Sequence, residues 1–386
     1  MRQQQLALTA AGHTVIMVSA ARGRGARVRS VDDGIEITPL FFLPGVDLPI
    51  IANSAATRST LDELFESRGV EVVHVQTDFG LAHAAADVAA IRSIPVIHTV
   101  HTFYWASEDN WFNPLAGLAR WALTRITGLD IPKETFTPRA VDNLLRNVTL
   151  GMAQRADTVV SPSAHQARDL QAAGVTGPVA LVPNPVSTSP RPPMPLPAPT
   201  SGPRFLWVAR CEPVKRPLPF ARAAIEALKR TDGGFSIDFV GDGTEHAELR
   251  RIVAGHPQLR VQGSLPHDDV LDLMDAASIV VLTSVGFDNQ PMTIAEAVSR
   301  HRGILYCDPK LREGLLRAGY LAPGHDEASL ADAIVELVRD PLLMTQLSHG
   351  AAEDGAQFSP GVFVDRIVRV FDAAVLKLAQ ERGTPH

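Results

Sequence analysis

Residues 281–297 read VLTSVGFDNQPMTIAEA, and the rest of the chain is organised around this stretch. Its first residues end an apolar run rich in β-branched side chains, which is typical of a buried strand. A polar loop follows, and Pro291 then stands where the first residue of a helix is expected, because its fixed φ suits that position. The free N–H groups of a helix start attract anions, so the stretch predicts a strand–loop–helix unit that can hold a diphosphate.

Two carboxylates, Asp288 and Glu296, bracket the predicted start of this helix. A carboxylate repels phosphate, so we expect both to bind hydroxyl groups, such as those of ribose or a hexose. Two acids at this spacing also occur by chance, and a solvated loop followed by a Glu on a helix face is the alternative.

The pattern S-x3-[DE]-x7-E followed by Ala, here Ser284, Asp288 and Glu296, resembles the signature of the retaining family-4 glycosyltransferases. The resemblance implies an α/β chain with the GT-B fold, in which two Rossmann-like, doubly wound domains face a central cleft. It implies that Glu296 binds the nucleotide ribose and that Asp288, where the family usually has Glu, contacts the donor sugar. It also implies that backbone groups of Asn289 and Gln290 hold the diphosphate.

Composition limits the class of protein. The chain has 386 residues, of which 45% are hydrophobic, so it can form two domains of ordinary size. A formal net charge of -6 argues against nucleic acid as the main partner. The two cysteines, Cys211 and Cys307, lie far apart and are expected to be buried thiols in a reducing compartment. No apolar run approaches the roughly 20 residues of a membrane helix and no signal peptide opens the chain, so we expect a cytoplasmic protein.

Strand and helix patterns alternate along the chain, which predicts βαβ units and doubly wound parallel sheets. We expect an N-terminal, acceptor-side Rossmann-like domain at residues 1–187 and a nucleotide-sugar-binding domain of the same type at residues 204–357. Residues 188–203 are expected to form a stiff linker, because seven prolines fall within residues 190–203. The resemblance implies that the last segment, residues 358–386, forms a helix that returns to the first domain.

Residues 1–11 have the pattern of a helix, and residues 13–19 have that of a strand. In the family a further strand and a glycine-rich loop precede this pair, and neither is present in this sequence. That strand would lie in the middle of the N-terminal sheet, so its loss would expose apolar edges on both of its neighbours. We therefore expect the sequence to be short at its N-terminus, through a late start codon for example.

Thr99, Val100 and His101 end a predicted strand at residues 96–100. Ligands of doubly wound sheets collect at the carboxyl ends of the strands, so His101 is well placed to bind one. A lone His at such a position is more often structural, and we expect His98 to be so. The family has a T-x-H motif here, and the resemblance implies that His101 contacts the donor sugar near the reacting carbon.

Arg210 and Lys215 follow the first predicted strand of the second domain, residues 204–209. Two cations at the carboxyl end of a strand can neutralise a departing diphosphate, although an Arg and a Lys at this spacing are more often surface charges. They match the family motif G-R-x4-K, with Ala209 in place of Gly. The resemblance therefore assigns both cations to the leaving group.

Two further loops complete the predicted donor site. Gly241 and Gly243 belong to a Gly-Asp-Gly turn after a predicted strand, similar to a turn of the family, although such a turn alone is weak evidence. Ser264 and Leu265 lie in the loop that, by the resemblance, contacts the base through its backbone. The Gly-Gly pair that the family has in a later loop is absent, and Asp308 begins the segment that replaces it.

A cluster of aromatic residues lies within residues 103–127, and apolar side chains recur there at helical spacing from Trp111 onward. We expect this segment to pack in a core. The alternative is a surface that contacts a membrane or a lipid acceptor, since Trp and Arg on an amphipathic helix suit an interface. The basic segment 22–29, RGRGARVR, is expected to be a solvated loop, with an anion or lipid-headgroup contact as the alternative. Residues 34–43 alternate as a single strand.

The joint order of the T-x-H, R-x4-K, Gly-Asp-Gly and D-x7-E motifs predicts a retaining hexosyltransferase. We expect it to move a hexose from a nucleotide-diphosphate sugar to a hydroxyl of a lipid or small glycoside. No metal ion or other cofactor is implied, because two cations and a helix start can stabilise the leaving group. No carboxylate is placed as a nucleophile, which fits attack from the face that the leaving group occupies.

Two alternatives to this activity stay open. One is a catalytically impaired protein that binds nucleotide sugars, which Asp288 and the lost Gly-Gly pair favour. The other is a sugar-nucleotide 2-epimerase, which needs additional acids facing C2, and none can be identified. Peripheral contact with the inner face of a membrane would accompany a lipid acceptor, and nucleic acid is not expected as a partner.

Overall fold

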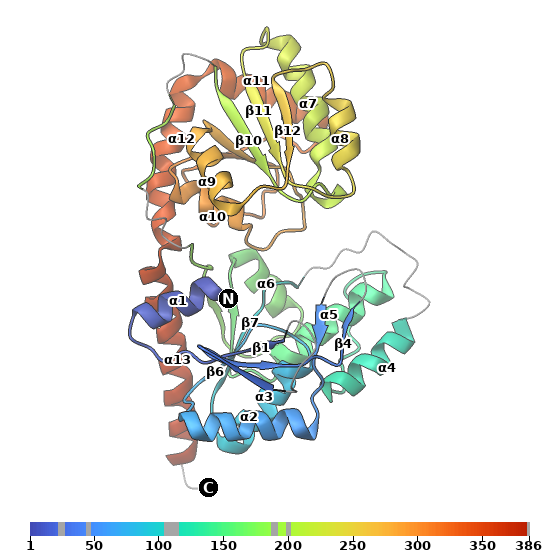
Figure 1. Ribbon diagram of the computed structural model, residues 1–386, viewed down its shortest axis with the longest axis vertical. Helices are drawn as coiled ribbons and strands as arrows, with labels where there is room; N and C mark the ends of the chain where they lie inside the picture. The colour runs from blue at the N-terminus through green and yellow to red at the C-terminus, as the bar shows by residue number, and fades with distance from the viewer. Residues whose placement is uncertain (22–27, 44–47, 104–115, 187–191, 198–201, 384–386) are drawn as a thin grey trace. The chain divides into compact units, whose positions relative to one another are not determined.

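The chain is described by a computed structural model over residues 1–21, 28–43, 48–103, 116–186, 192–197 and 202–383. It divides into two compact units, one formed by Met1–Val182 with Val364–His386 and the other by Pro183–Phe363. Each unit is built on a parallel sheet with helices packed against it, as the alternating strand and helix patterns predict (Figure 1).

The first unit contains a four-stranded parallel sheet in the order β6-β7-β8-β9. Its strands are Val73–Val75, Val96–Thr99, Thr158–Ser161 and Val179–Leu181. The helices that alternate with these strands are α3 (Gly80–Arg92), α4 (Ala116–Thr127), α5 (Ala140–Ala153) and α6 (Ala164–Ala172). Helix α3 is rich in alanine, and its alanines fill the core beside β6 together with Leu61 and Phe65 of α2 (Ala55–Arg68).

Two smaller sheets complete the N-terminal part of this unit. Strands β1 (Met17–Ala20), β3 (Gly34–Ile37) and β2 (Val28–Val31) form one of them, after α1 (Arg2–Ala10), and β4 (Phe41–Leu43) pairs with β5 (Leu48–Ile50). Within the described residues no strand joins β1 to β6, so each is an edge of its own sheet. Val18 of β1 nevertheless packs against the cores beside both sheets, as do Leu64 and Leu81.

Two predictions for this part of the chain are wrong. Residues 34–43 form two strands and not one, because Pro39 has no N–H to donate and interrupts the run after Ile37. The end of the basic segment 22–29 is not a loop, since β2 begins at Val28 and pairs antiparallel with β3. The beginning of that segment lies outside the described residues.

The second unit contains a six-stranded parallel sheet in the order β12-β11-β10-β13-β14-β15. In that order its strands are Leu259–Gly263, Ser236–Val240, Arg204–Val208, Ile279–Leu282, Gly303–Tyr306 and Gly319–Leu321. Side chains of one strand alternate between two cores: Phe205 and Trp207 enter the first, and Leu206 enters the second. The sheet is therefore buried on both faces.

Helices cover each of these faces. The first core takes side chains from α7 (Pro217–Arg230), α8 (His246–Ile252) and α11 (Glu327–Arg339), and the second from α9 (His267–Ala276) and α10 (Met292–Ser299). Helix α12 (Pro341–Asp354) contributes to both cores. The arrangement is the doubly wound sheet that the sequence predicts.

The last helix, α13, spans Pro360–Gly383, and from Val364 onward it belongs to the first unit. There Phe371 packs edge-on against His74, with 5.6 Å between the ring centroids, and Arg382 donates a hydrogen bond to the carbonyl of Ser93. Among the described residues, no helix is long and apolar enough to cross a bilayer.

Residues 192–197 of the proline-rich stretch accept hydrogen bonds from two arginines of the second unit. Arg300 donates to the carbonyl of Pro192 at 3.3 Å, and Arg302 donates to those of Met194 and Pro195 at 3.0 and 3.2 Å. The Arg302 side chain is fully buried and donates its other hydrogen bonds to backbone carbonyls of the second unit. This buried cation is therefore satisfied partly by the proline-rich stretch.

Candidate active site

The strand order of the second unit reverses between β10 and β13. The chain runs outward from β10 to β12, returns to β13 and then runs outward in the opposite direction to β15. Ligands of such sheets bind outside the carboxyl ends of the strands at this switch point. The loop after β10 carries Arg210 and Lys215, and the loop after β13 carries Asp288, Asn289 and Gln290. These predicted residues thus meet where a ligand is expected.

Lys215 and Asp288 form an ion pair across the switch point, with 2.5 Å between Nζ and Oδ1. Their side chains are only 14% and 12% exposed, so water screens this pair less than an ordinary surface pair. Ser284 donates a hydrogen bond to the other oxygen of Asp288, and Lys215 Nζ lies 4.8 Å from the ring centroid of Phe287. These contacts within the protein thus hold the cation and the carboxylate in place.

The backbone at Lys215 is also supported. The indole N–H of Trp207 donates to Thr283 Oγ1 at 2.9 Å, and the Thr283 hydroxyl donates to the carbonyl of Lys215 at 2.6 Å. Both supporting side chains are buried. Arg210 at the same edge is different: it is exposed, and its guanidinium has no hydrogen-bond or ion-pair partner among the described residues.

Residues 284–291, here called the donor loop, are fixed at two further points. The N–H of Gly286 donates to one oxygen of the buried Asp308 at 2.6 Å. Gln290 Oε1 accepts hydrogen bonds from the backbone N–H and the side-chain amide of Asn184, at 2.7 and 2.9 Å. Gln290 Nε2 donates to the carbonyl of Asn184 at 3.2 Å. The side chain of Gln290 therefore binds protein, which leaves the predicted ligand contacts to the backbone.

Helix α10 follows the donor loop with one difference from the prediction. Pro291 has the expected φ of -65°, but its ψ of 120° is extended, so it is the N-cap and Met292 is the first helical residue. Glu296 lies on the second turn and is half-buried. Burial raises the pKa of its carboxyl, although His267 nearby opposes the shift. This environment favours hydrogen bonds to neutral hydroxyl groups.

Gly241 and Gly243 bring the loop after β11 against the loop after β10. A Cβ on Gly241, whose φ is +136°, would lie 1.8 Å from the carbonyl oxygen of Ala209. A Cβ on Gly243, with φ +155°, would lie 2.6 Å from a backbone carbonyl of the same loop. Only glycine permits these approaches. Ser264 and Leu265 lie between β12 and α9 at the same sheet edge.

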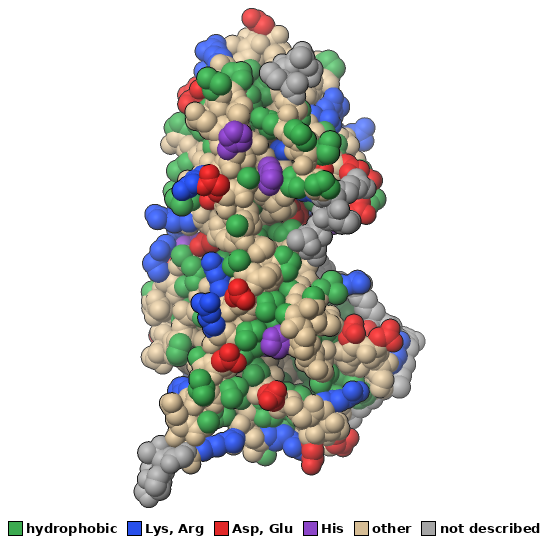
Figure 2. All heavy atoms as spheres, turned by 90° about the vertical axis from the view of Figure 1, so that its left-hand side faces the viewer, with side chains coloured by type: hydrophobic (Ala, Val, Ile, Leu, Met, Phe, Trp, Pro, Cys, Tyr) green, Lys and Arg blue, Asp and Glu red, His purple; other side chains and the backbone are tan. Residues whose placement is uncertain are grey.

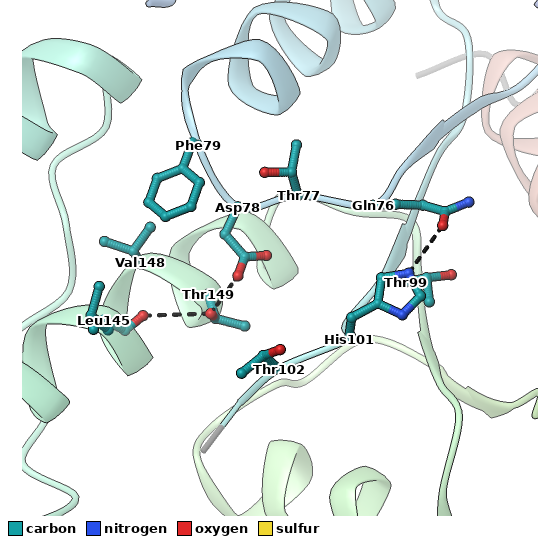
Figure 3. Close-up of a pocket in the computed structure, with 10 residues that line it drawn as sticks. All are labelled: Gln76, Thr77, Asp78, Phe79, Thr99, His101, Thr102, Leu145, Val148 and Thr149. Carbon is teal, nitrogen blue, oxygen red and sulfur yellow. Dashed lines mark hydrogen bonds between the residues drawn. The ribbon is translucent and has the colours of Figure 1, made fainter. Parts of the chain in front are cut away.

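In the first unit a pocket of about 140 Å³ opens at the carboxyl ends of β6 and β7 (Figure 3). Residues Gln76, Thr77 and Asp78 follow β6, and His101 and Thr102 follow β7. The rest of the lining comes from Phe79, Thr99, Leu145, Val148 and Thr149. His101, the predicted site residue of this unit, thus lies in a defined pocket and donates from Nε2 to Gln76 Oε1 at 3.0 Å.

The carboxylate of Asp78 lies in this pocket and is bound by two side chains. His98 donates to Asp78 Oδ1 at 2.8 Å, and Thr149 donates to Asp78 Oδ2 at 2.7 Å. Burial alone would raise the pKa of Asp78, but the hydrogen bond from His98 and the other contacts lower it, so the carboxylate is charged. Burial lowers the pKa of His101 to about 4, and the Met1 amino group adds to this effect. His98 has the structural role expected of it.

The aromatic segment is only partly described, since Trp111 and its neighbours lie outside the described residues. Phe103 is buried, as predicted, but on α4 Leu118 is 64% and Trp121 58% exposed, so the prediction of core packing is wrong for these two. The guanidinium of Arg125 lies 5.2 Å from the Trp121 ring centroid. On the face of the molecule that Figure 2 shows, acidic and basic side chains are interspersed and do not form a field of one sign.

Two family models of known proteins match this chain, one over most of each unit. Residues 5–190 match the family model Glycosyltransferase Family 4, and residues 202–340 match Glycosyl transferases group 1. The chain belongs to glycosyltransferase family 4. The predicted resemblance and the GT-B, α/β fold are thus confirmed.

Relatives of this glycosyltransferase include two D-inositol 3-phosphate glycosyltransferases. The one from Acidothermus cellulolyticus is 27% identical over 394 residues, which cover 93% of this chain and 81% of the relative. The one from Catenulispora acidiphila is 28% identical over 181 residues, 45% of this chain and only 41% of the relative's length. Among solved structures, HepE from Anabaena in complex with UDP has a TM-score of 0.61 at 15% identity, covering 85% of this chain and 87% of HepE.

This glycosyltransferase also contains site residues that the sequence analysis did not identify. Asp78, Gln76 and Thr149 line the pocket around His101. The first two follow a strand end directly, as His101 does, and that position was the available signal. Asn184 also follows a strand end, that of β9, but nothing in the sequence indicated its contact with Gln290, which lies 106 positions away.

Proposed function

We propose that this glycosyltransferase moves a hexose from a nucleotide-diphosphate sugar to an acceptor hydroxyl, with retention of anomeric configuration and without a metal ion. The observation that carries the proposal is the shielded Lys215–Asp288 pair at the switch point of the second unit. A fixed cation and a fixed carboxylate side by side match a ligand that combines phosphate with sugar hydroxyls.

Each predicted donor residue has a role in this proposal. Lys215 and the exposed Arg210 bind the diphosphate, together with backbone N–H groups of Asn289 and Gln290 at the start of α10. Asp288 accepts hydrogen bonds from hydroxyls of the donor sugar, and Glu296 accepts them from the ribose. The backbone at Gly241, Gly243, Ser264 and Leu265 borders the nucleoside.

The proposed chemistry follows from these charges. The bond between the anomeric carbon and the diphosphate oxygen breaks, and negative charge grows on the diphosphate. Lys215, Arg210 and the N-terminus of α10 stabilise that charge, so a metal ion is not required for it. The acceptor oxygen then bonds to the anomeric carbon on the face that the leaving group has left, and its proton passes to the departing diphosphate. His101 is proposed to contact the donor sugar near the reacting carbon.

The acceptor is proposed to be a lipid or a small glycoside. Relatives whose names give D-inositol 3-phosphate as a substrate supply the first compounds to try. Exposed Leu118 and Trp121 beside Arg125 support a lipid acceptor reached at a membrane surface, because Trp and Arg on one helix face suit an interface.

The proposal is tested by measuring nucleoside diphosphate release from UDP-hexoses and GDP-hexoses by the purified chain, with and without EDTA. We expect release with at least one donor, no loss with EDTA, and an NMR coupling constant that shows the donor's anomeric configuration in the product. Saturable binding of UDP or GDP without release from any donor would favour the impaired binding protein instead. A product of inverted anomeric configuration would overturn the proposed retention. Full loss of activity in EDTA would overturn the proposed independence of a metal ion.

A further inference from the structure

We infer that the pocket of the first unit receives an unphosphorylated, polyhydroxylated acceptor and discriminates against phosphate esters of the same compound. This inference rests on the proposed function, because it assigns the acceptor to this pocket. The inferred acceptor carries no phosphate, whereas the names of two relatives contain the phosphorylated compound D-inositol 3-phosphate.

The pocket has one side suited to hydroxyl groups and one suited to hydrocarbon. Figure 3 shows Gln76 and His101 on one side, with Asp78, Thr102 and Thr149 between them and the apolar Phe79, Leu145 and Val148. Amide, hydroxyl, imidazole and carboxylate groups can accept hydrogen bonds from, or donate them to, several hydroxyls at once. The apolar side can take the C–H face of a sugar or polyol ring.

The charges in the pocket are the reason for excluding phosphate. Among the described residues that line it there is no Lys or Arg, and the formal charge comes from Asp78. His101 is neutral near pH 7 because its pKa is lowered to about 4. A phosphate ester carries nearly two negative charges, and bringing it beside a shielded carboxylate without a cation is unfavourable.

Charged groups outside the lining also bear on this balance. The Met1 amino group acts on His101, but burial lowers its pKa and Met1 does not line the pocket. Residues 104–115, which continue the chain after the pocket, contain Glu108 and Asp109 and no Lys or Arg. The three arginines of residues 22–27 lie outside the described residues.

The test compares matched acceptors that differ only in a phosphate, such as myo-inositol with D-inositol 3-phosphate and glucose with glucose 6-phosphate. With an identified donor, kcat/KM for each acceptor is measured from nucleoside diphosphate release, after subtraction of donor hydrolysis. We expect each unphosphorylated acceptor to be favoured at least about 10-fold. A phosphorylated acceptor that reacts equally well or better would overturn the inference.

The Asp78→Asn variant tests the cause, since it removes the charge and keeps the shape. We expect the ratio of kcat/KM for the unphosphorylated acceptor to that for its phosphate ester to fall about 10-fold, because kcat/KM for the ester increases. Thr149→Val removes a hydrogen bond and no charge, so it should leave this ratio unchanged. An unchanged preference in a folded Asp78→Asn protein would contradict the role of the carboxylate. If that variant does not fold, the comparison of acceptors on the unmodified chain still decides.

A binding measurement separates this inference from the proposed function. Saturation-transfer NMR of the same acceptor pairs, with UDP present, does not require turnover. If no donor is turned over but myo-inositol binds and its phosphate does not, the proposed activity fails and the charge selectivity of the pocket stands. If transfer occurs and the phosphate ester binds more tightly, the activity stands and this inference fails.

Discussion

The side chain of Gln290 makes three hydrogen bonds to Asn184, which lies 106 positions earlier in the chain. Asn184 belongs to the segment that begins the second unit, and Gln290 belongs to the donor loop. The position of the loop that is proposed to hold the diphosphate is therefore set partly by Asn184, which is not itself among the predicted ligand-binding residues. Asn184 and Gln290 act as positioning residues.

Replacing either residue should weaken donor binding, and replacing Gln290 should weaken it more than replacing Asn184. Gln290→Ala removes three hydrogen bonds and Asn184→Ala removes one, because the backbone groups of Asn184 remain. At about 1 kcal/mol for each bond, Gln290→Ala should raise the donor KM by up to roughly 100-fold and Asn184→Ala only several-fold. Steady-state kinetics over a range of donor concentrations measures both, and a larger effect of Asn184→Ala would contradict the ordering.

Lys215→Ala should lower kcat by about two orders of magnitude, because it removes a shielded cation proposed to stabilise the leaving diphosphate. Lys229→Ala is the matched control, since Lys229 forms an exposed pair with Glu226 on α7 and should leave kcat unchanged. Turnover of the identified donor is the measurement. Equal turnover by Lys215→Ala and the unmodified chain would remove Lys215 from the mechanism.

Acid should destabilise the first unit before it destabilises the second. Burial lowers the pKa of His74 to about 3, and those of His83 and His101 to about 4. Between these values and about 6.5, the unfolded chain binds protons that the folded unit does not, so stability falls as the pH decreases through this window. The pKa of Asp78 is lowered in the folded protein, so protonation of this carboxyl causes a further loss of stability as the pH falls below the usual pKa of Asp.

Hydrogen exchange of peptides that cover β6 and β7, compared with peptides that cover β10 and β13, reports this difference. We expect protection of β6 and β7 to decrease between pH 7 and pH 4.5 while that of β10 and β13 changes less. His74→Gln, which retains a group able to bond to Thr99, should reduce the pH dependence. Equal protection of β6 and β7 at both pH values would show that the histidines do not have this effect.

Gly241→Ala should destabilise the second unit and remove activity, because the added Cβ would lie 1.8 Å from the Ala209 carbonyl. Gly255 provides a control, since its φ of +88° is also positive but a Cβ there meets nothing within 4 Å. Gly255→Ala should cost only the roughly 1 kcal/mol of the unfavourable backbone conformation. Thermal unfolding compares the two, and similar losses would mean that φ, and not the close approach, makes Gly241 necessary.

Sequence patterns predicted those strands and helices that the residues of their own segment determine. Strand β11 is such an element, because it is a run of mostly buried side chains followed directly by Gly241, the first residue of the Gly-Asp-Gly turn. Helix α7 was not predicted, since Pro217 and Pro219 resemble breakers although both stand in its first turn, where proline is tolerated. Pro39 has the opposite effect, and it divided an alternating run that was predicted to be one strand.

Some parts of the candidate site could likewise be predicted from local sequence patterns, and others could not. The strand ends, and with them His101, Arg210 and Lys215, could be placed from the sequence because a parallel sheet brings all carboxyl ends to one edge. The contacts that fix Asp288 and Gln290 could not, since they depend on which loops the fold brings together. The pocket around Asp78 required the packing of α5 against β6 and β7, which no local pattern specifies.

The proline-rich stretch has a consequence for recombination between relatives. Arg302 is a fully buried cation that depends on the carbonyls of Met194 and Pro195. A chimaera joined just before β10 would take the arginine from one parent and these carbonyls from the other, and a mismatch would leave buried donors without acceptors. A junction upstream of Pro192 keeps both partners of this contact from the same parent.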